Sequence, residues 1–150
     1  MKIAIGSDHA GYLLKETIKE YLIQSLKIEL EDCGCFSMDP VDYPDIAEKV
    51  ASSILRKTAQ KGILICGTGI GMSISANKFP GIRAALCHEP VSAYFSSAHN
   101  NANILTMGGR IIGGEVAKAI VKAWLETDFQ GGHHKRRIEK IQNQELRNVC

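Results

Sequence analysis

The residues best suited to chemistry lie in a short glycine-rich segment near the middle of the chain. Cys66 ends an apolar run, and the next five residues alternate glycine with other types: Gly67, Thr68, Gly69, Ile70 and Gly71. Glycines let backbone N–H groups approach a ligand closely, and N–H groups next to a helix start stabilise negative charge. A cysteine in such a place favours its thiolate form, which can act as a nucleophile or a base. A tight packing turn beside an inert, buried cysteine is the simpler alternative.

Three other polar clusters accompany this segment. Asp8 and His9 follow the first apolar run, His99 and Asn100 end a predicted helix, and Arg110 follows the last apolar run. A single histidine is more often structural than catalytic. Two histidines with an aspartate and a cysteine, all near strand ends, are the usual set for general acid–base catalysis.

The C-terminal tail carries a basic segment, residues 131–137, with the sequence GGHHKRR. Its Arg137 and the earlier Arg110 are candidates for a phosphate clamp, because guanidinium groups donate forked hydrogen bonds to phosphate. A solvated helix face is the simpler interpretation of Lys135 and Arg136. The net charge of the chain is only +2, which fits one phosphate site better than a nucleic-acid surface.

Strand and helix patterns alternate along the whole chain. Short apolar runs predict strands at residues 2–6, 28–32, 62–66, 82–87 and 103–107. Apolar residues at helical spacing predict helices at about 11–25, 45–58, 71–78, 90–99, 114–127 and 134–148. The run at 62–66 is continuously apolar, as is typical of a parallel strand buried on both faces.

This alternation predicts an α/β fold: a three-layer Rossmann-like (flavodoxin-like) domain with a five-stranded parallel sheet, helices on both faces and a C-terminal helical tail. We find no linker or internal repeat, so we expect one domain over residues 1–150. In such sheets ligands bind at the carboxyl ends of the strands, near the switch point in strand order. We therefore expect all the polar clusters, including His99 and Asn100, at one edge of the sheet.

The composition indicates the class of protein and the cellular compartment to expect. Hydrophobic residues make up 45% of the 150 residues and charged residues 23%, as in a typical globular protein. The N-terminus lacks the pattern of a signal peptide, and no apolar run approaches the roughly 18 residues that span a bilayer. We expect a cytoplasmic protein without a membrane partner. The five cysteines are an odd number, and Cys33-x-Cys35 is too tightly spaced for a usual zinc site, so we predict neither disulfides nor a metal.

Taken together, the motifs resemble those of the ribose-5-phosphate isomerase B family, which includes the galactose-6-phosphate isomerase subunits. The resemblance covers nearly the whole chain, in order. It is carried by SDHAG at 7–11, DYP at 42–44, ICGTGIG at 65–71, ANK at 76–78, GIRA at 81–84, HNxAN at 99–103 and GG at 131–132. The 99–100 pair and the basic tail look more like the ribose enzyme than the galactose one.

The resemblance implies an aldose–ketose isomerase of the non-oxidative pentose phosphate pathway, working through an enediolate without a cofactor. Cys66 would be the base that moves a proton between C1 and C2. Backbone N–H groups of 67–71 would stabilise the enediolate, with the Thr68 hydroxyl adding to them. His99 would be the acid that opens the furanose ring.

The resemblance also implies binding roles and a partner. Asp8, His9 and Asn100 would hold the sugar hydroxyls and ring oxygen, and Tyr43 would line the pocket. The phosphate would be bound by Arg110, His133 and Arg137. The family forms homodimers and often homotetramers with a shared active site. His99, Asn100 and the basic residues, with the tail at about 131–150, should therefore come from the partner subunit.

One position departs from the family pattern. Many members carry arginine where this chain has His133, and a neutral imidazole binds phosphate more weakly than a guanidinium does. Lys135 is a possible substitute. The departure also leaves the preferred substrate open.

Three other functions remain open from the sequence. The nearest is isomerisation of a six-carbon sugar phosphate, such as allose or galactose 6-phosphate. A cysteine phosphatase would need arginine six residues after Cys66, where this chain has Met72. A flavodoxin-like module that only binds a metabolite would tolerate the loss of Cys66.

Overall fold

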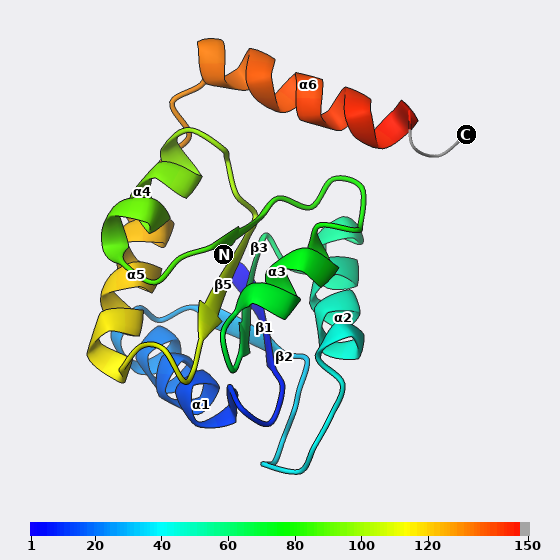
Figure 1. The fold of residues 1–150 in the computed structure, drawn as a ribbon. Helices are drawn as coiled ribbons and strands as arrows, with labels where there is room; N and C mark the ends of the chain where they lie inside the picture. Colours follow the sequence, from blue (N-terminus) through cyan, green and yellow to red (C-terminus); the bar gives the residue numbers. More distant parts are fainter. Residues whose placement is uncertain (148–150) are drawn as a thin grey trace.

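The computed structural model describes residues 1–147, which form one parallel sheet between two layers of helices (Figure 1). The strand order is β2-β1-β3-β5-β4, and every neighbouring pair is parallel. The strands are β1 (Lys2–Ser7), β2 (Glu29–Asp32), β3 (Lys61–Cys66), β4 (Ala84–Leu86) and β5 (Ile104–Gly108). The predicted three-layer α/β class is confirmed.

Helices cover both faces of the sheet. On one face lie α1 (Tyr12–Glu20), the π-helical turn η1 (Tyr21–Ser25) that continues it, α4 (Pro90–Ala98) and α5 (Gly114–Glu126). On the other lie α2 (Tyr43–Leu55) and α3 (Ile70–Ala76). Within the described residues, no helix combines the length and the apolar character needed to cross a membrane.

The core is divided by the sheet into two apolar clusters, because successive side chains of a strand point to opposite faces. Ile63 and Ile65 of β3 pack with the α1, α4 and α5 layer, whereas Leu64 and Cys66 pack with α2 and α3. All of these side chains are at most 5% exposed. The continuous apolar run of β3 is therefore explained by burial on both sides, as predicted. It also decides which face Cys66 occupies.

Several predicted elements differ in extent from those of the structure, most clearly α2 and β4. Helix α2 begins at Tyr43 rather than at about 45, because Asp42 is extended and Pro44 occupies the first turn, where its fixed φ suits a helix. Strand β4 spans only Ala84–Leu86 rather than 82–87. Just before it, the Arg83 N–H donates to the Asn103 side-chain oxygen (2.8 Å) instead of to a neighbouring strand.

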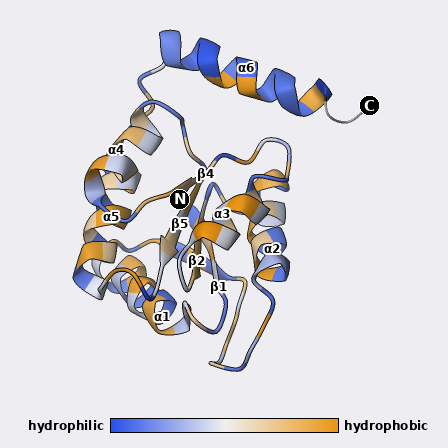
Figure 2. Cartoon of the chain, viewed as in Figure 1, coloured by the Kyte–Doolittle hydropathy of each residue, from blue (hydrophilic) through white to orange (hydrophobic). Residues whose placement is uncertain are grey.

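Helix α6 (His133–Arg147) stands apart from the three layers, near the amino ends of the strands (Figure 1). It is mostly hydrophilic (Figure 2), and Ile138 is its buried residue. A carboxylate oxygen of Glu145 accepts the Gly81 N–H at 3.0 Å and so ties the helix to the body. The predicted helical tail is confirmed to Arg147, and the remaining residues 148–150 lie outside the described part.

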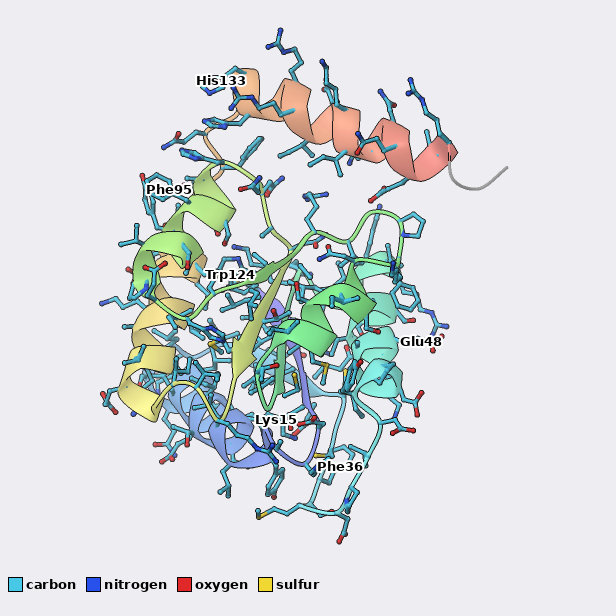
Figure 3. All side chains as sticks on the ribbon, in the orientation of Figure 1. Lys15, Phe36, Glu48, Phe95, Trp124 and His133 are labelled. Atoms are coloured by element: carbon cyan, nitrogen blue, oxygen red, sulfur yellow. The ribbon has the colours of Figure 1, made fainter. Side chains whose placement is uncertain are left out.

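A buried lysine ties α1 to the carboxyl end of β2 and to the loop that follows it. The Lys15 side chain, labelled in Figure 3, is fully buried. Its Nζ donates to Asp32 Oδ1 (2.9 Å) and to the Cys35 carbonyl oxygen (2.6 Å), and it lies 5.2 Å from the centre of the Phe36 ring. Burial alone would raise the pKa of Asp32, but hydrogen bonds from Lys15, Lys19 and the backbone outweigh burial and lower it.

We expect Lys15→Met to lower the free energy of unfolding by about 3 kcal/mol, because it leaves a partly buried carboxylate without its main partner. The folded-state pKa of Asp32 is depressed, so the ion pair stabilises the fold above pH of about 4 and is lost as the pH falls. The difference between wild type and variant should therefore shrink in acid. Urea unfolding at several pH values measures it.

The matched control for this substitution is Lys118→Met, which breaks the exposed pair with Glu115 and should cost less than about 1 kcal/mol. Equal losses in the two variants would show that Lys15 contributes no more than a surface charge does.

Candidate active site

The clusters that follow β1, β3 and β5 meet at the carboxyl edge of the sheet. Strands β1 and β3 are neighbours, yet the helix after β1 packs on one face and the helix after β3 on the other. Such a divergence opens a crevice at the strand ends. Backbone hydrogen bonds join the three loops: Asp8 N–H donates to Ile65 O (3.1 Å), and Gly109 N–H donates to Cys66 O (2.8 Å).

Cys66 occupies the centre of this edge. Its side chain is 5% exposed, and its Sγ accepts a hydrogen bond from the Gly69 N–H at 3.1 Å. A backbone N–H directed at sulfur stabilises a thiolate more than a thiol, because hydrogen bonds to an ionised acceptor are the stronger ones. One N–H of the glycine loop, that of Gly69, therefore reaches the Cys66 sulfur.

The loop can adopt this shape only with glycine at position 69. The backbone φ of Gly69 is +78°, in the left-handed region. A Cβ added there would lie 2.7 Å from the Met107 carbonyl carbon in β5 and 2.6 Å from Leu86 Cδ1. Both backbone conformation and space therefore exclude a side chain at the residue whose N–H reaches Cys66.

Asp8 and His9 leave part of their hydrogen-bonding capacity for a ligand. Asp8 is 7% exposed, and its Oδ1 accepts the Gly11 N–H at 2.9 Å. The Nδ1 of His9 accepts the Val41 N–H at 3.4 Å. A neutral imidazole that accepts at Nδ1 carries its proton on Nε2, so His9 presents a donor at its other nitrogen.

Two further predicted residues complete this edge. The Tyr43 ring lies against Gly71, where an added Cβ would come within 2.7 Å of Cζ. The Arg110 side chain lies over Gly67, with its Cδ 3.5 Å from the position of an added Cβ, and the Arg110 N–H donates to Gly67 O at 3.0 Å. Arg110 thus lies beside the loop that follows Cys66 in its own chain, whereas the sequence led us to expect all the basic residues from the partner.

His99 and Asn100 do not lie at this edge, contrary to the expectation from the sequence. Helix α4 starts after the carboxyl end of β4 and runs back, so its end reaches the amino edge of the sheet (Figure 1). There the Asn100 carbonyl accepts from Arg83 Nε (3.1 Å), just before β4. β5 then begins at Ile104, opposite Gly62 at the start of β3. Cys66 lies four residues farther along β3, or about 13 Å at 3.3 Å per residue.

His99 instead joins a cluster of histidines at the start of α6. Its ring stacks on that of His134 with 4.1 Å between centres and 9° between planes, and the His133 ring is 3.9 Å from that of His134. Desolvation first, and then the nearby His133, His99 and Arg137, lower the pKa of His134. Several positive or potentially positive groups therefore face one another here, as an anion-binding site requires.

The other described cysteines are free thiols in different surroundings. Burial raises the pKa of Cys33 and of Cys87, since a thiolate is poorly solvated there. Cys35 is buried and donates to the Ser37 carbonyl oxygen. Cys150 lies outside the described residues. Across residues 1–147, no three His, Cys, Asp or Glu side chains gather in a way that could hold a metal ion.

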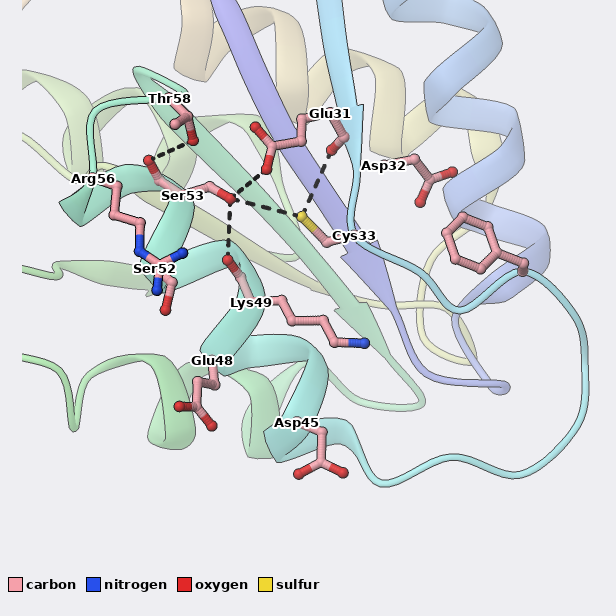
Figure 4. Close-up of a pocket in the computed structure, with 11 residues that line it drawn as sticks. Glu31, Asp32, Cys33, Asp45, Glu48, Lys49, Ser52, Ser53, Arg56 and Thr58 are labelled. Carbon is pink, nitrogen blue, oxygen red and sulfur yellow. Dashed lines mark hydrogen bonds between the residues drawn. The ribbon is translucent and has the colours of Figure 1, made fainter.

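A wide groove lies elsewhere, between β2 and α2 (Figure 4). Its volume is about 850 Å³, and it contains none of the predicted site residues. Its wall is held by Ser53, which donates to Glu31 Oε1 (2.6 Å) and Lys49 O (3.2 Å). This groove is therefore separate from the carboxyl edge, where the candidate acid–base groups meet the glycine loop.

Sequence reasoning missed two histidines. His88 lies directly after β4, and its Nε2 is 3.1 Å from the Thr68 carbonyl oxygen. His134 stacks on His99 as described above. The rule that chemistry follows strand ends could have indicated His88. The stacking of His134 depends on how α6 returns to the body, and no local pattern shows that.

Comparison with known proteins places this geometry in one family. The profile of the family described as "Ribose/Galactose Isomerase" matches residues 3–141. Ribose-5-phosphate isomerase B of Escherichia coli is 48% identical over 93% of this chain and 93% of its own. D-erythrulose-4-phosphate isomerase of Pectobacterium atrosepticum is 46% identical over 94% of this chain and 93% of its own.

Solved structures of ribose-5-phosphate isomerases B share this fold. Ribose-5-phosphate isomerase B of Clostridium thermocellum superposes with a TM-score of 0.97 at 47% identity, covering 99% of both chains. The enzyme of Mycoplasma genitalium, solved with bound ribulose-5-phosphate, superposes with a TM-score of 0.92 at 39% identity, covering 97% of this chain and 96% of its own.

We expect Gly69→Ala to lower the free energy of unfolding by about 2 kcal/mol or more, because the added Cβ would meet β5 in a backbone conformation that disfavours side chains. The control is Gly113→Ala, where φ is −84° and nothing lies within 4 Å of the added Cβ. It should change stability by less than about 1 kcal/mol. Urea unfolding measures the free energy of unfolding of both variants. A Gly69→Ala protein as stable as the wild type would contradict the close contact between position 69 and β5.

Proposed function

The chain belongs to the ribose/galactose isomerase family of enzymes, and we propose that it interconverts ribose 5-phosphate and ribulose 5-phosphate. The observation that carries the proposal is the hydrogen bond from Gly69 N–H to Cys66 Sγ, in a glycine loop flanked by Asp8, His9 and Arg110. This reaction belongs to the non-oxidative branch of the pentose phosphate pathway, and we infer a cytoplasmic location.

In the proposed reaction the Cys66 thiolate acts as the base. It removes the proton from C2 of the open-chain aldose, and the two electrons of that C–H bond form the C1–C2 double bond of an enediolate. The proton then returns to C1, and the carbonyl forms at C2 as O2 loses its proton and O1 gains one, so oxidation at C2 balances reduction at C1. No redox cofactor takes part. A thiolate supported by an N–H donor suits this proton transfer near neutral pH.

The negative charge of the enediolate develops on oxygen, beside the loop of residues 67–71. Backbone N–H groups fixed before the reaction stabilise such charge without having to reorganise, and the Thr68 hydroxyl is one more possible donor. Asp8 and the Nε2–H of His9 would bind sugar hydroxyls. Tyr43 would form the wall behind them, since its ring already packs against Gly71.

Ring opening and phosphate binding would use groups at the amino edge of the sheet in a second chain. The partner's His99 would protonate the ring oxygen, and the partner's Asn100 would hold the sugar. The phosphate would lie between Arg110 and the partner's His133 and Arg137. The proximity of Arg137 and the imidazole rings at the start of α6 supports this role, although His133 is a weaker ligand than arginine.

A second copy of the chain is the proposed partner because one chain keeps Cys66 and His99 at opposite edges of the sheet. The edge strand β4 and the adjoining helices also expose large apolar side chains. Six of these are 37–62% exposed, namely Ile70, Ile74, Leu86, Val91, Tyr94 and Phe95. Figure 3 labels Phe95 among them. A monomer seldom leaves such a group uncovered.

Other substrates are the main rivals. The family description names galactose as well as ribose, so a six-carbon sugar phosphate remains the alternative. The similarity to a D-erythrulose-4-phosphate isomerase adds a four-carbon substrate. The phosphatase alternative is weakened further, because Met72 is fully buried at the position where that mechanism needs an arginine.

We expect the purified protein, without added metal, to form ribulose 5-phosphate from ribose 5-phosphate, and Cys66→Ser to lower kcat by at least about 100-fold through loss of the base. Cys33→Ser should keep near-wild-type kcat, because the Cys33 thiol contacts Glu31 O and Ser53 Oγ rather than the glycine loop. Far-ultraviolet circular dichroism should be unchanged in both. An active Cys66→Ser enzyme would exclude the base role. A kcat/KM higher for allose 6-phosphate or erythrulose 4-phosphate would overturn the choice of substrate.

The shared site predicts complementation between two inactive variants. When differently tagged Cys66→Ala and His99→Ala chains are co-expressed and isolated as mixed dimers, one of the two sites contains both native residues. Such dimers should show about half of the wild-type activity per dimer. The reciprocal control pairs a wild-type chain with a chain carrying both substitutions, which leaves no complete site. Activity in the control rather than in the first mixture would show that each site lies within one chain.

A further inference from the structure

His88 is a histidine at the carboxyl edge to which the proposed mechanism gives no role. The N–H of Cys87 donates to Thr106 O (3.1 Å), which continues the pairing of β4 with β5, and His88 is the next residue. Two residues later α4 begins, and the Glu89 side chain caps it by accepting from Val91 N–H (2.6 Å) and Ser92 N–H (2.7 Å). The backbone of His88 is therefore held on both sides.

The imidazole of His88 points to the glycine loop. Its Nε2 lies 3.1 Å from the carbonyl oxygen of Thr68. A carbonyl only accepts, so Nε2 must carry the proton and donate it. The same carbonyl packs against β5 from another side, because a Cβ added at Gly108 would lie 2.8 Å from both its carbon and its oxygen. The Thr68 carbonyl is thus held by one hydrogen bond and one backbone contact.

That carbonyl shares a peptide unit with the N–H that reaches Cys66. The peptide between Thr68 and Gly69 is planar, and its C=O and N–H point in opposite directions. Its oxygen faces His88, and its N–H donates to Cys66 Sγ at 3.1 Å. Gly69 permits many backbone conformations, so the residues of the loop do not by themselves keep the N–H of this peptide on sulfur. The backbone of β5 limits the path of the loop, and His88 is the side chain that binds the carbonyl of this peptide. A contact from outside the loop must select the orientation.

We propose that His88 is a positioning residue for the isomerisation, which fixes the Thr68–Gly69 peptide and thereby keeps the Gly69 N–H on the Cys66 thiolate. Two hydrogen bonds in series through one peptide also polarise each other, so the His88 contact strengthens the donation to sulfur. The proposal rests on the proposed function for its effect on turnover. Its effect on the reactivity of Cys66 does not depend on that function.

The test compares His88→Ala, which removes the donor, with His88→Gln, which keeps an N–H at the end of a side chain of similar reach. Two quantities are measured: the rate of Cys66 alkylation by iodoacetamide at pH 7, followed by mass spectrometry of the Cys66 peptide, and kcat and KM for ribose 5-phosphate. We expect His88→Ala to lower the alkylation rate and kcat by roughly two- to tenfold, the range of one hydrogen bond, with little change in KM. His88→Gln should recover most of both losses.

Glu89→Ala is the matched control, because it loosens the start of α4 without removing the contact to Thr68. If Glu89→Ala slows alkylation as much as His88→Ala does, the effect comes from the fold and the proposal is overturned. Unchanged alkylation in His88→Ala also overturns it. A wild-type protein that lacks isomerase activity would instead refute the proposed function, while the alkylation rates would still decide the role of His88.

Discussion

The site depends on direct contact between the backbone of the loop after β3 and that of the end of β5. Gly109 N–H and Arg110 N–H donate to Cys66 O and Gly67 O, so the parallel pairing of the two strands continues into the loops. Gly69 lies so close to Met107 that no Cβ fits between them. This contact sets the path of the glycine loop. The path in turn aims one N–H at the sulfur and places Arg110 beside Gly67.

The direction of the chain separates the two halves of the proposed chemistry. All strands are parallel, so each helix must return from the carboxyl edge to the amino edge before the next strand starts. Helix α4 begins beside the glycine loop and ends at His99, after nine residues or about 14 Å. The proposed acid, His99, and the proposed base, Cys66, therefore lie at opposite edges of the sheet in one chain. In a two-fold dimer, His99 of one chain could meet Cys66 of the other, and the protein would then be active only as a dimer.

Much of the fold and half of the site could be predicted from local patterns. Alternation of apolar runs with helical spacing predicted the parallel sheet, and the continuous run of β3 predicted burial on both faces. Because parallel strands share one carboxyl edge, the grouping of Asp8, Cys66 and Arg110 followed. The same rule failed for His99, since a residue that ends a helix lies at the opposite edge from one that ends a strand.

The sequence by itself determined which residue types follow each strand, because the periodicity of apolar residues and the positions of glycines show where the strands end. Only the tertiary structure decided how they face one another. The hydrogen bonds of the Thr68–Gly69 peptide, to His88 on one side and Cys66 on the other, join three segments through backbone atoms that every residue type shares. The stacking of His134 on His99 depends on the return of α6 across the amino edge. Contacts of this kind leave no periodic trace in the sequence, because they arise from where the elements pack.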